Sequence, residues 1–202
     1  MTCRVGELVI ECEVEPWQRI GLRVDDGIAQ VGAVILRFVP GTGGLVGWGL
    51  VDAPAATDLI DGLATHHVSA PTVRAPDGPD HPLGIVGFDH LVVMTSSLER
   101  TCGAIEAATA APLKRIRELG AVRQGFHRMG EMIIEVVETP QVTWPTAAFW
   151  GFVWNLANLP EACAALGPDV VSLPKPAVQA GRFISTVRAE VGLKLPLALM
   201  SA

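Results

Sequence analysis

Two short apolar segments of the chain each contain one side chain that can hold a ligand or move a proton. Segment 88–94 carries His90, and segment 132–137 carries Glu135. A buried strand that includes a histidine or a glutamate must satisfy that group with a partner, a metal or water. The two residues therefore predict a pocket.

Strong hydrogen-bonding side chains occur near these segments. Arg123, Gln124 and Arg128 share one predicted strand, and Gln179 and Arg182 flank a glycine further along the chain. Arginine suits bidentate recognition of carboxylate and phosphate groups. These five residues are candidates for binding an acidic small molecule, and surface arginines on edge strands are the alternative interpretation.

The elements that would position these residues follow a regular order. A strand, a helix and three strands are predicted at residues 88–95, 97–109, 113–117, 122–129 and 132–137. In the helical segment Leu98, Cys102 and Ile105 recur at three- and four-residue spacing, and either Ser96 or Ser97 suits its start. Together these elements form one βαβββ unit.

The same unit recurs along the chain. The glycine-led segment 130–137 aligns with 32–39, and 150–153 aligns with 48–51. Ordered recurrence of several such matches indicates internal repetition. We count four half-modules, of which the first two are degenerate, at about 6–40, 44–68, 87–140 and 147–202.

A segment rich in proline and glycine divides the chain. Proline fixes φ and lacks a backbone donor, so residues 69–86 do not suit a helix interior or a central strand. We predict degenerate βαβββ-like half-modules in 1–68, a linker in 69–86, and a larger domain in 87–202 with modules 87–140 and 147–202.

Paired βαβββ modules, with a His on a first strand and a Glu on a last strand, resemble the vicinal oxygen chelate superfamily. That superfamily includes glyoxalase I, extradiol dioxygenases and bleomycin-resistance proteins. The stretch Leu-Gly-Ile-Val-Gly-Phe-Asp-His-Leu-Val-Val at 83–93 resembles the opening of glyoxalase-like proteins. The resemblance implies an α+β fold in which two modules form a half-open eight-stranded barrel, with the degenerate N-terminal pair beside it.

In that superfamily the concave face holds a divalent metal such as zinc, nickel, manganese or iron. The resemblance assigns the ligand positions of the first module to His90 and Glu135, and those of the second to Gly151 and Leu197, which offer no donor. His127 is a candidate third ligand or substrate contact. A catalytic metal normally has about three protein ligands, so the predicted set is incomplete. The alternative to a metal ligand is a structural role for His90, in which Glu135 or a backbone carbonyl accepts its hydrogen bond.

Composition restricts the partners. The formal net charge is -6, which disfavours nucleic acid and anionic membranes as partners, and no apolar run is long enough for a membrane span. The first residues lack the apolar core of a signal peptide. We therefore expect a cytoplasmic protein with four reduced cysteines.

The resemblance implies a small-molecule pocket and a metal-assisted lyase, isomerase or dioxygenase acting on a small oxygenated or carbonyl substrate. Without a metal, Glu135 or His90 would act as general base on an acidic C–H. The alternative is a non-enzymatic protein that sequesters a drug-like molecule and has a decayed metal site. A third interpretation is an assembly component: Trp150, Phe152 and Trp154 share one face of a predicted strand, which suits a core or a homodimer interface.

Overall fold

The computed structural model describes residues 2–70 and 83–202, so most of the predicted linker lies outside the described residues. The described strands form two mixed sheets, one of six and one of eight strands. No helix in the described part of the chain is long and apolar enough to span a membrane.

The eight-stranded sheet has the order β12-β13-β14-β11-β7-β10-β9-β8. In each half the last strand returns to lie parallel to the first, β10 beside β7 and β14 beside β11, while β7 and β11 pair antiparallel at the centre. This is the predicted pair of βαβββ modules. Its elements are β7 (Ile85–Thr95), α2 (Leu98–Thr109), β8 (Leu113–Leu119), β9 (Val122–Met129), β10 (Met132–Glu138), β11 (Ala148–Leu156), α3 (Leu159–Leu166), β12 (Lys175–Pro176), β13 (Phe183–Thr186) and β14 (Leu197–Ser201).

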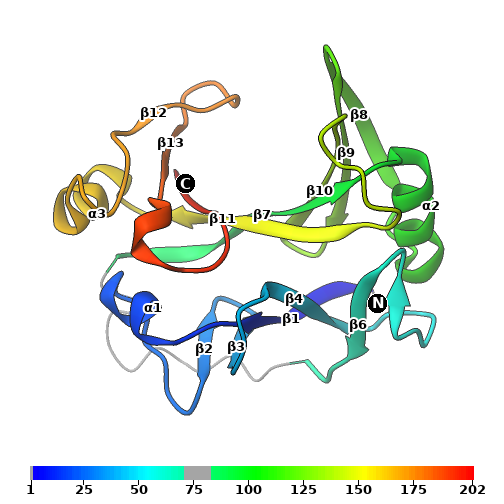
Figure 1. Ribbon diagram of the computed structural model, residues 1–202, viewed down its shortest axis with the longest axis horizontal. Helices are drawn as coiled ribbons and strands as arrows, with labels where there is room; N and C mark the ends of the chain where they lie inside the picture. The colour runs from blue at the N-terminus through cyan, green and yellow to red at the C-terminus, as the bar shows by residue number, and fades with distance from the viewer. Residues whose placement is uncertain (1, 71–82) are drawn as a thin grey trace.

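The two modules form an open cup. Figure 1 shows β7 and β11 as its floor, with β8, β9 and β10 rising on one side and β13 on the other. The end strands β12 and β8 are not paired with each other among the described residues, so the sheet does not close into a barrel. The fold prediction is confirmed.

The first helix of the cup begins as its sequence predicts. Ser97 is extended, and its side chain accepts a hydrogen bond from the backbone N–H of Arg100, which caps α2. The helix ends where Ala110 turns to a positive φ of 55°. Because α2 lies outside the cup wall (Figure 1), the concave face remains free for side chains of the strands.

The six-stranded sheet repeats the topology of the cup in reduced form. Its order is β2-β3-β1-β4-β6-β5, with β3 parallel to β1, β6 parallel to β4, and β1 antiparallel to β4. The second half-module keeps two short strands after its first strand and has no helix. The elements are β1 (Arg4–Glu11), α1 (Glu15–Arg19), β2 (Ile28–Val31), β3 (Val34–Val39), β4 (Gly44–Val51), β5 (Leu59–Ile60) and β6 (Leu63–His67).

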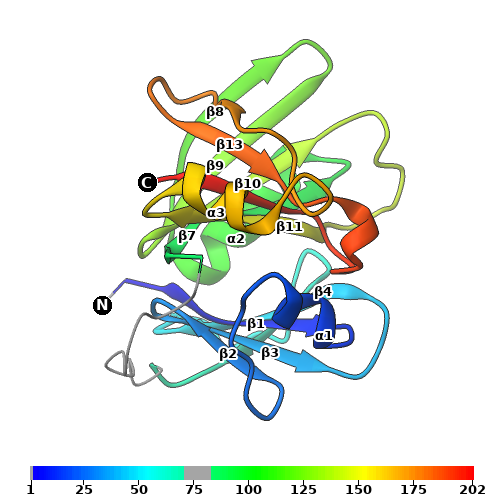
Figure 2. The ribbon, with the colours of Figure 1, turned by 90° about the vertical axis from the view of Figure 1, so that its left-hand side faces the viewer.

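Aromatic side chains fill the space between the two sheets. Figures 1 and 2 show the smaller sheet against the convex side of the cup. Trp17 of α1 lies 6.0 Å, between ring centroids, from both Phe152 and Trp154, and Trp48 lies 5.4 Å from Phe149. The N-terminal part of the chain thus covers the aromatic face of β11.

Trp150 does not share the face of Phe152 and Trp154 that strand alternation predicts. The register between β11 and β7 shifts between Phe149 and Gly151, so Trp150 is an extra residue in a bulge. The bulge reverses the alternation, and Trp150 is 50% exposed on the concave side while the other two are buried.

Candidate functional site

The concave face of the cup contains a cavity of about 430 Å³. Its lining is mostly apolar, with a small polar group on the floor. The apolar lining includes Val92, Met94, Val137, Trp150, Val153 and Leu197, and the polar lining includes His90, Gln124 and Glu135. A mostly apolar cavity with a few convergent polar groups is typical of a small-molecule site.

The floor of the cavity brings His90 and Glu135 together. Glu135 on β10 pairs with Val92 on β7, two residues after His90, so both side chains emerge on one face. His90 Nε2 lies 3.3 Å from Glu135 Oε2. The amide nitrogen of Gln124 donates a hydrogen bond of 2.6 Å to Glu135 Oε1.

Asp89 completes this polar group, although strand alternation would place it on the opposite face from His90. A second register shift, where Val153 pairs with His90 and Trp154 with Phe88, leaves Asp89 as the extra residue. Its Oδ2 lies 2.7 Å from His90 Nδ1. Sequence reasoning missed Asp89, and the available signal was a charged residue directly before the histidine in an apolar run.

The protonation of this group follows from burial and hydrogen bonding. Burial alone would raise the pKa of Asp89, but hydrogen bonds from His90 and Arg182 outweigh it and lower that pKa to about 2. An ionised Asp89 can only accept, so the Nδ1 of His90 carries a proton. The other ring nitrogen of His90, Nε2, faces Glu135.

Glu135 has the opposite shift. Burial raises its pKa, and the nearby positive charges of His90 and Arg117 only partly counter this. A carboxyl group that holds its proton more tightly than usual, with an oxygen 3.3 Å from a histidine ring nitrogen, forms a pair that can exchange a proton.

Arg182 supports Asp89 and does not line the cavity. Its Nη1 donates to Asp89 Oδ1 at 2.7 Å and its Nε to the Ser201 carbonyl at 2.7 Å, and it also bonds Asn155. Gln179, exposed, accepts from Arg182 at 2.8 Å. Both residues lie together beside the site, and Arg182 holds the carboxylate that orients His90.

His127 lies on the opposite face of β9 from Gln124 and is 1% exposed. Its Nδ1 lies 2.9 Å from the Ala111 carbonyl, and burial lowers its pKa. The alternation of β9 turns His127 away from the cup, so it is not placed to be a third ligand beside His90 and Glu135.

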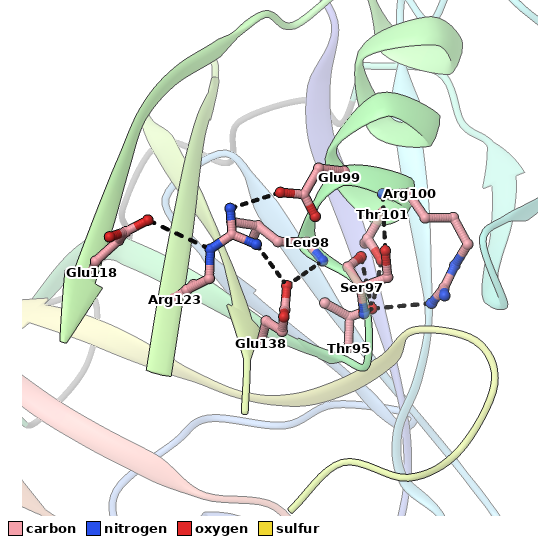
Figure 3. Close-up of polar contacts among 9 residues, drawn as sticks. All are labelled: Thr95, Ser97, Leu98, Glu99, Arg100, Thr101, Glu118, Arg123 and Glu138. Atoms are coloured by element: carbon pink, nitrogen blue, oxygen red, sulfur yellow. Dashed lines mark hydrogen bonds and ion pairs between the residues drawn. The ribbon is translucent and has the colours of Figure 1, made fainter. Parts of the chain in front are cut away.

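Two of the predicted arginines are also placed outside the cavity. Arg123 faces α2, and its Nη2 lies 2.6 Å from Glu99 and its Nη1 3.3 Å from Glu138 (Figure 3). Arg128 is exposed and donates to the Glu131 carbonyl at 3.1 Å. Gln124 alone among the predicted substrate-binding residues lines the cavity.

The donors present do not fit the divalent metal that the fold typically holds. The first module offers His90 and Glu135, while a side chain at Gly151 would place its Cβ 2.1 Å from the Pro196 carbonyl oxygen. Leu197 and Ala198 add no donor to that half of the cavity, and Thr186 offers it only a neutral hydroxyl. No group of three His, Cys, Asp or Glu suited to a metal occurs within residues 2–70 and 83–202.

Comparisons with known proteins support the fold. No protein-family model matches the sequence, and no curated protein matches it. A mutant of 4-hydroxymandelate synthase from Streptomyces coelicolor superimposes with a TM-score of 0.66 at 13% identity, covering 98% of this chain and 92% of that one. Methylmalonyl-CoA epimerase from Mycobacterium tuberculosis superimposes with a TM-score of 0.50 at 10% identity, covering 59% of this chain and 90% of that one.

Both of these proteins are members of the vicinal oxygen chelate superfamily. The chain therefore has the vicinal oxygen chelate fold, as its sequence resemblance predicts. At these identities the likeness shows the fold alone, and the function must be argued from the site.

Proposed function

We propose that this protein is an isomerase-type enzyme that moves a proton on a small carbonyl compound, with His90 and Glu135 as its acid–base pair. The observation that carries the proposal is their 3.3 Å contact on the floor of a mostly apolar cavity of about 430 Å³. Perturbed titratable groups in such a cleft are candidates for catalysis.

The step requires only groups of this chain. In the base form, His90 Nε2 or ionised Glu135 takes the proton from a C–H next to a carbonyl, and the C–H electron pair moves onto the carbonyl oxygen as an enolate. The partner that is still protonated returns a proton to the same or a neighbouring carbon. Asp89, held by Arg182, keeps the imidazole in one orientation throughout.

The apolar walls serve this chemistry in two ways. Val92, Met94 and Trp150 exclude water from the reacting carbon, and Gln124 fixes the Glu135 carboxyl by its 2.6 Å hydrogen bond. Exclusion of water keeps the pKa of Glu135 raised, which brings it nearer to neutral pH, where a general acid or base is most effective.

Deuterium exchange tests the proposal. The protein would be incubated in D2O with a propionyl thioester, 2-butanone and 2-oxobutyrate, and loss of the α-proton followed by NMR. We expect exchange above the buffer rate for at least one probe and a fall of roughly 100-fold or more in Glu135→Gln. Glu131→Gln, which removes an exposed carboxylate from the turn before β10, is the matched control and should exchange like wild type.

A non-enzymatic binding protein is the second candidate. Val153, Leu197 and Ala198 make the second module's part of the cavity mostly apolar, with Thr186 as a neutral polar residue, which suits sequestration of an apolar molecule. Binding in the cavity with exchange no faster than buffer would favour this function over the enzyme. The proposed homodimer is tested separately by light scattering, where a monomer at micromolar concentration would contradict it.

A further inference from the structure

The wall of the cup formed by β8 and β9 carries arginines on its concave face. Arg117 on β8 pairs with Gln124, and Arg115 pairs with Phe126, which in turn pairs with Glu135 on β10. Residues paired directly across strands emerge on the same face of a sheet. Arg115 and Arg117 therefore belong to the same surface as the cavity.

A third arginine lies on this face. Arg128 on β9 pairs with Ile133, and Ile133 pairs with His90 on β7. Each of the three arginines thus belongs to a row of residues paired across neighbouring strands, and each row includes one polar residue of the site: Gln124, Glu135 or His90. The guanidinium of Arg115 lies over the Phe126 ring at 4.7 Å from its centroid, a cation–π contact that holds it along the wall.

These three arginines, like Arg19 and Arg23, form no ion pair with a carboxylate within the described residues, and the charges of Arg117 and Arg115 only partly counter the raised pKa of Glu135. Arg128 bonds only a backbone carbonyl, and no ion pair joins Arg115 or Arg117 to an acidic residue among residues 2–70 and 83–202. The arginines with carboxylate partners are Arg37, Arg100, Arg123 and Arg182. In a chain with a net charge of -6, the unpaired arginines on the wall are a local positive surface.

We propose that Arg115 and Arg117 bind an oxyanion of the ligand, a carboxylate or a phosphate, while its apolar part fills the cavity. The inference rests on the proposed function, because it adds the charge and shape of the ligand to the site of His90 and Glu135. Planar guanidinium groups bind both kinds of oxyanion in bidentate fashion.

The sheet geometry sets the size of such a ligand. Neighbouring strands are about 4.8 Å apart, so β8 lies roughly 10 Å from β10 across β9. An arginine side chain reaching back along the wall covers part of that span. The oxyanion should therefore be separated from the reacting carbon at His90 and Glu135 by only a few bonds. A ligand of this size does not need a large nucleotide conjugate to bind.

Matched probes test the charge preference. Isothermal titration would compare 4-phenylbutyrate, 3-phenylpropyl phosphate and the neutral 4-phenylbutyramide at low and high salt. We expect the wild type to bind at least one anion roughly tenfold or more tightly than the amide, with the preference reduced by salt. A preference for the carboxylate or the phosphate identifies which oxyanion the wall selects.

The double variant Arg115→Gln/Arg117→Gln should lose the preference and bind acid and amide alike. The control variant Arg19→Gln/Arg23→Gln removes the same amount of charge from exposed positions of the N-terminal region, and it should keep the preference for the anion. Equal binding of the amide and both anions by the wild type, no binding of either anion, or a preference that survives in the double variant would overturn the inference.

The two proposals fail differently. An intact anion preference with no deuterium exchange would refute the proton-transfer function and leave the oxyanion site standing. Exchange on a neutral ketone with no anion preference would refute the oxyanion site and leave His90 and Glu135 as the acid–base pair.

Discussion

Glu135→Gln keeps the shape of the side chain that meets His90 and removes its charge. The side chain is 14% exposed, its Oε1 accepts from Gln124 at 2.6 Å, and its Oε2 lies 3.3 Å from His90 Nε2. A glutamine here still accepts from Gln124, and its own N–H can donate to an unprotonated Nε2. We therefore expect the free energy of unfolding at pH 7 to change by less than about 1 kcal/mol or to rise.

The pH dependence of this variant has a definite sign. Burial raises the pKa of Glu135 above its usual 4.5, so the folded protein favours the protonated form. Wild type then loses stability as the pH rises from about 4.5 through the raised pKa, because the carboxylate must ionise in a poorly solvated place. The variant has no carboxyl group to ionise there, so its stability relative to wild type should increase as the pH rises from about 4.5 through the raised pKa of Glu135.

Urea unfolding of four proteins measures this effect: wild type, Glu135→Gln, His90→Ala and the double variant. If His90 and Glu135 were only a structural ion pair, Glu135→Gln would cost about 1–3 kcal/mol, and the cost would disappear in the His90→Ala background. That result would refute the proton-sharing interpretation and the acid–base function with it.

Three further outcomes are expected. Asp89→Asn should cost about 2 kcal/mol at pH 7 because it weakens the bonds to His90 and Arg182; the lowered pKa of about 2 means that wild type loses this stability as the pH falls from about 4 to 2, which acid unfolding measures. Gly151→Ala should lower the melting temperature sharply, since its Cβ meets the Pro196 carbonyl at 2.1 Å. One of the four thiols should react with Ellman's reagent before unfolding, because three cysteines are buried.

The sequence predicts the parts of the site that depend on strand order and period. The position of His90 on the first strand of a module, and of Glu135 on the last, follows from apolar runs that the structure retains as β7 and β10. Parallel return of β10 to β7 then brings the two together. The sequence predicts these features correctly because each depends on the apolar pattern of a whole segment.

The features that the sequence did not predict depend on single extra residues. Asp89 and Trp150 both lie at register shifts between β7 and β11. Each side chain therefore lies on the opposite face of the sheet from the one that regular strand alternation predicts. Arg115 and Arg117 were missed for a different reason. Their i, i+2 spacing on a predicted strand places them on one face, but which face it is depends on the pairing with β9.

The smaller sheet has a polar pair at the place that corresponds to His90 and Glu135. Glu7 on β1 pairs with Ile35, and Arg37 pairs with Val9 two residues later, which is the register that relates His90 to Glu135. Arg37 Nη2 lies 2.7 Å from Glu7 Oε2.

The chemistry of this second pair differs from that of the first. Burial alone would raise the pKa of Glu7, but hydrogen bonds from Arg37 and His66 outweigh it and lower that pKa. A guanidinium does not release its proton near neutral pH, so Glu7 and Arg37 form a fixed ion pair. His90 and Glu135 occupy the same scaffold position with an imidazole and a carboxyl group, which exchange a proton in the proposed function, on the floor of a cavity of about 430 Å³. The choice of side chains at one pair of registered positions, and not the fold, therefore decides which of the two sheets is suited to move a proton.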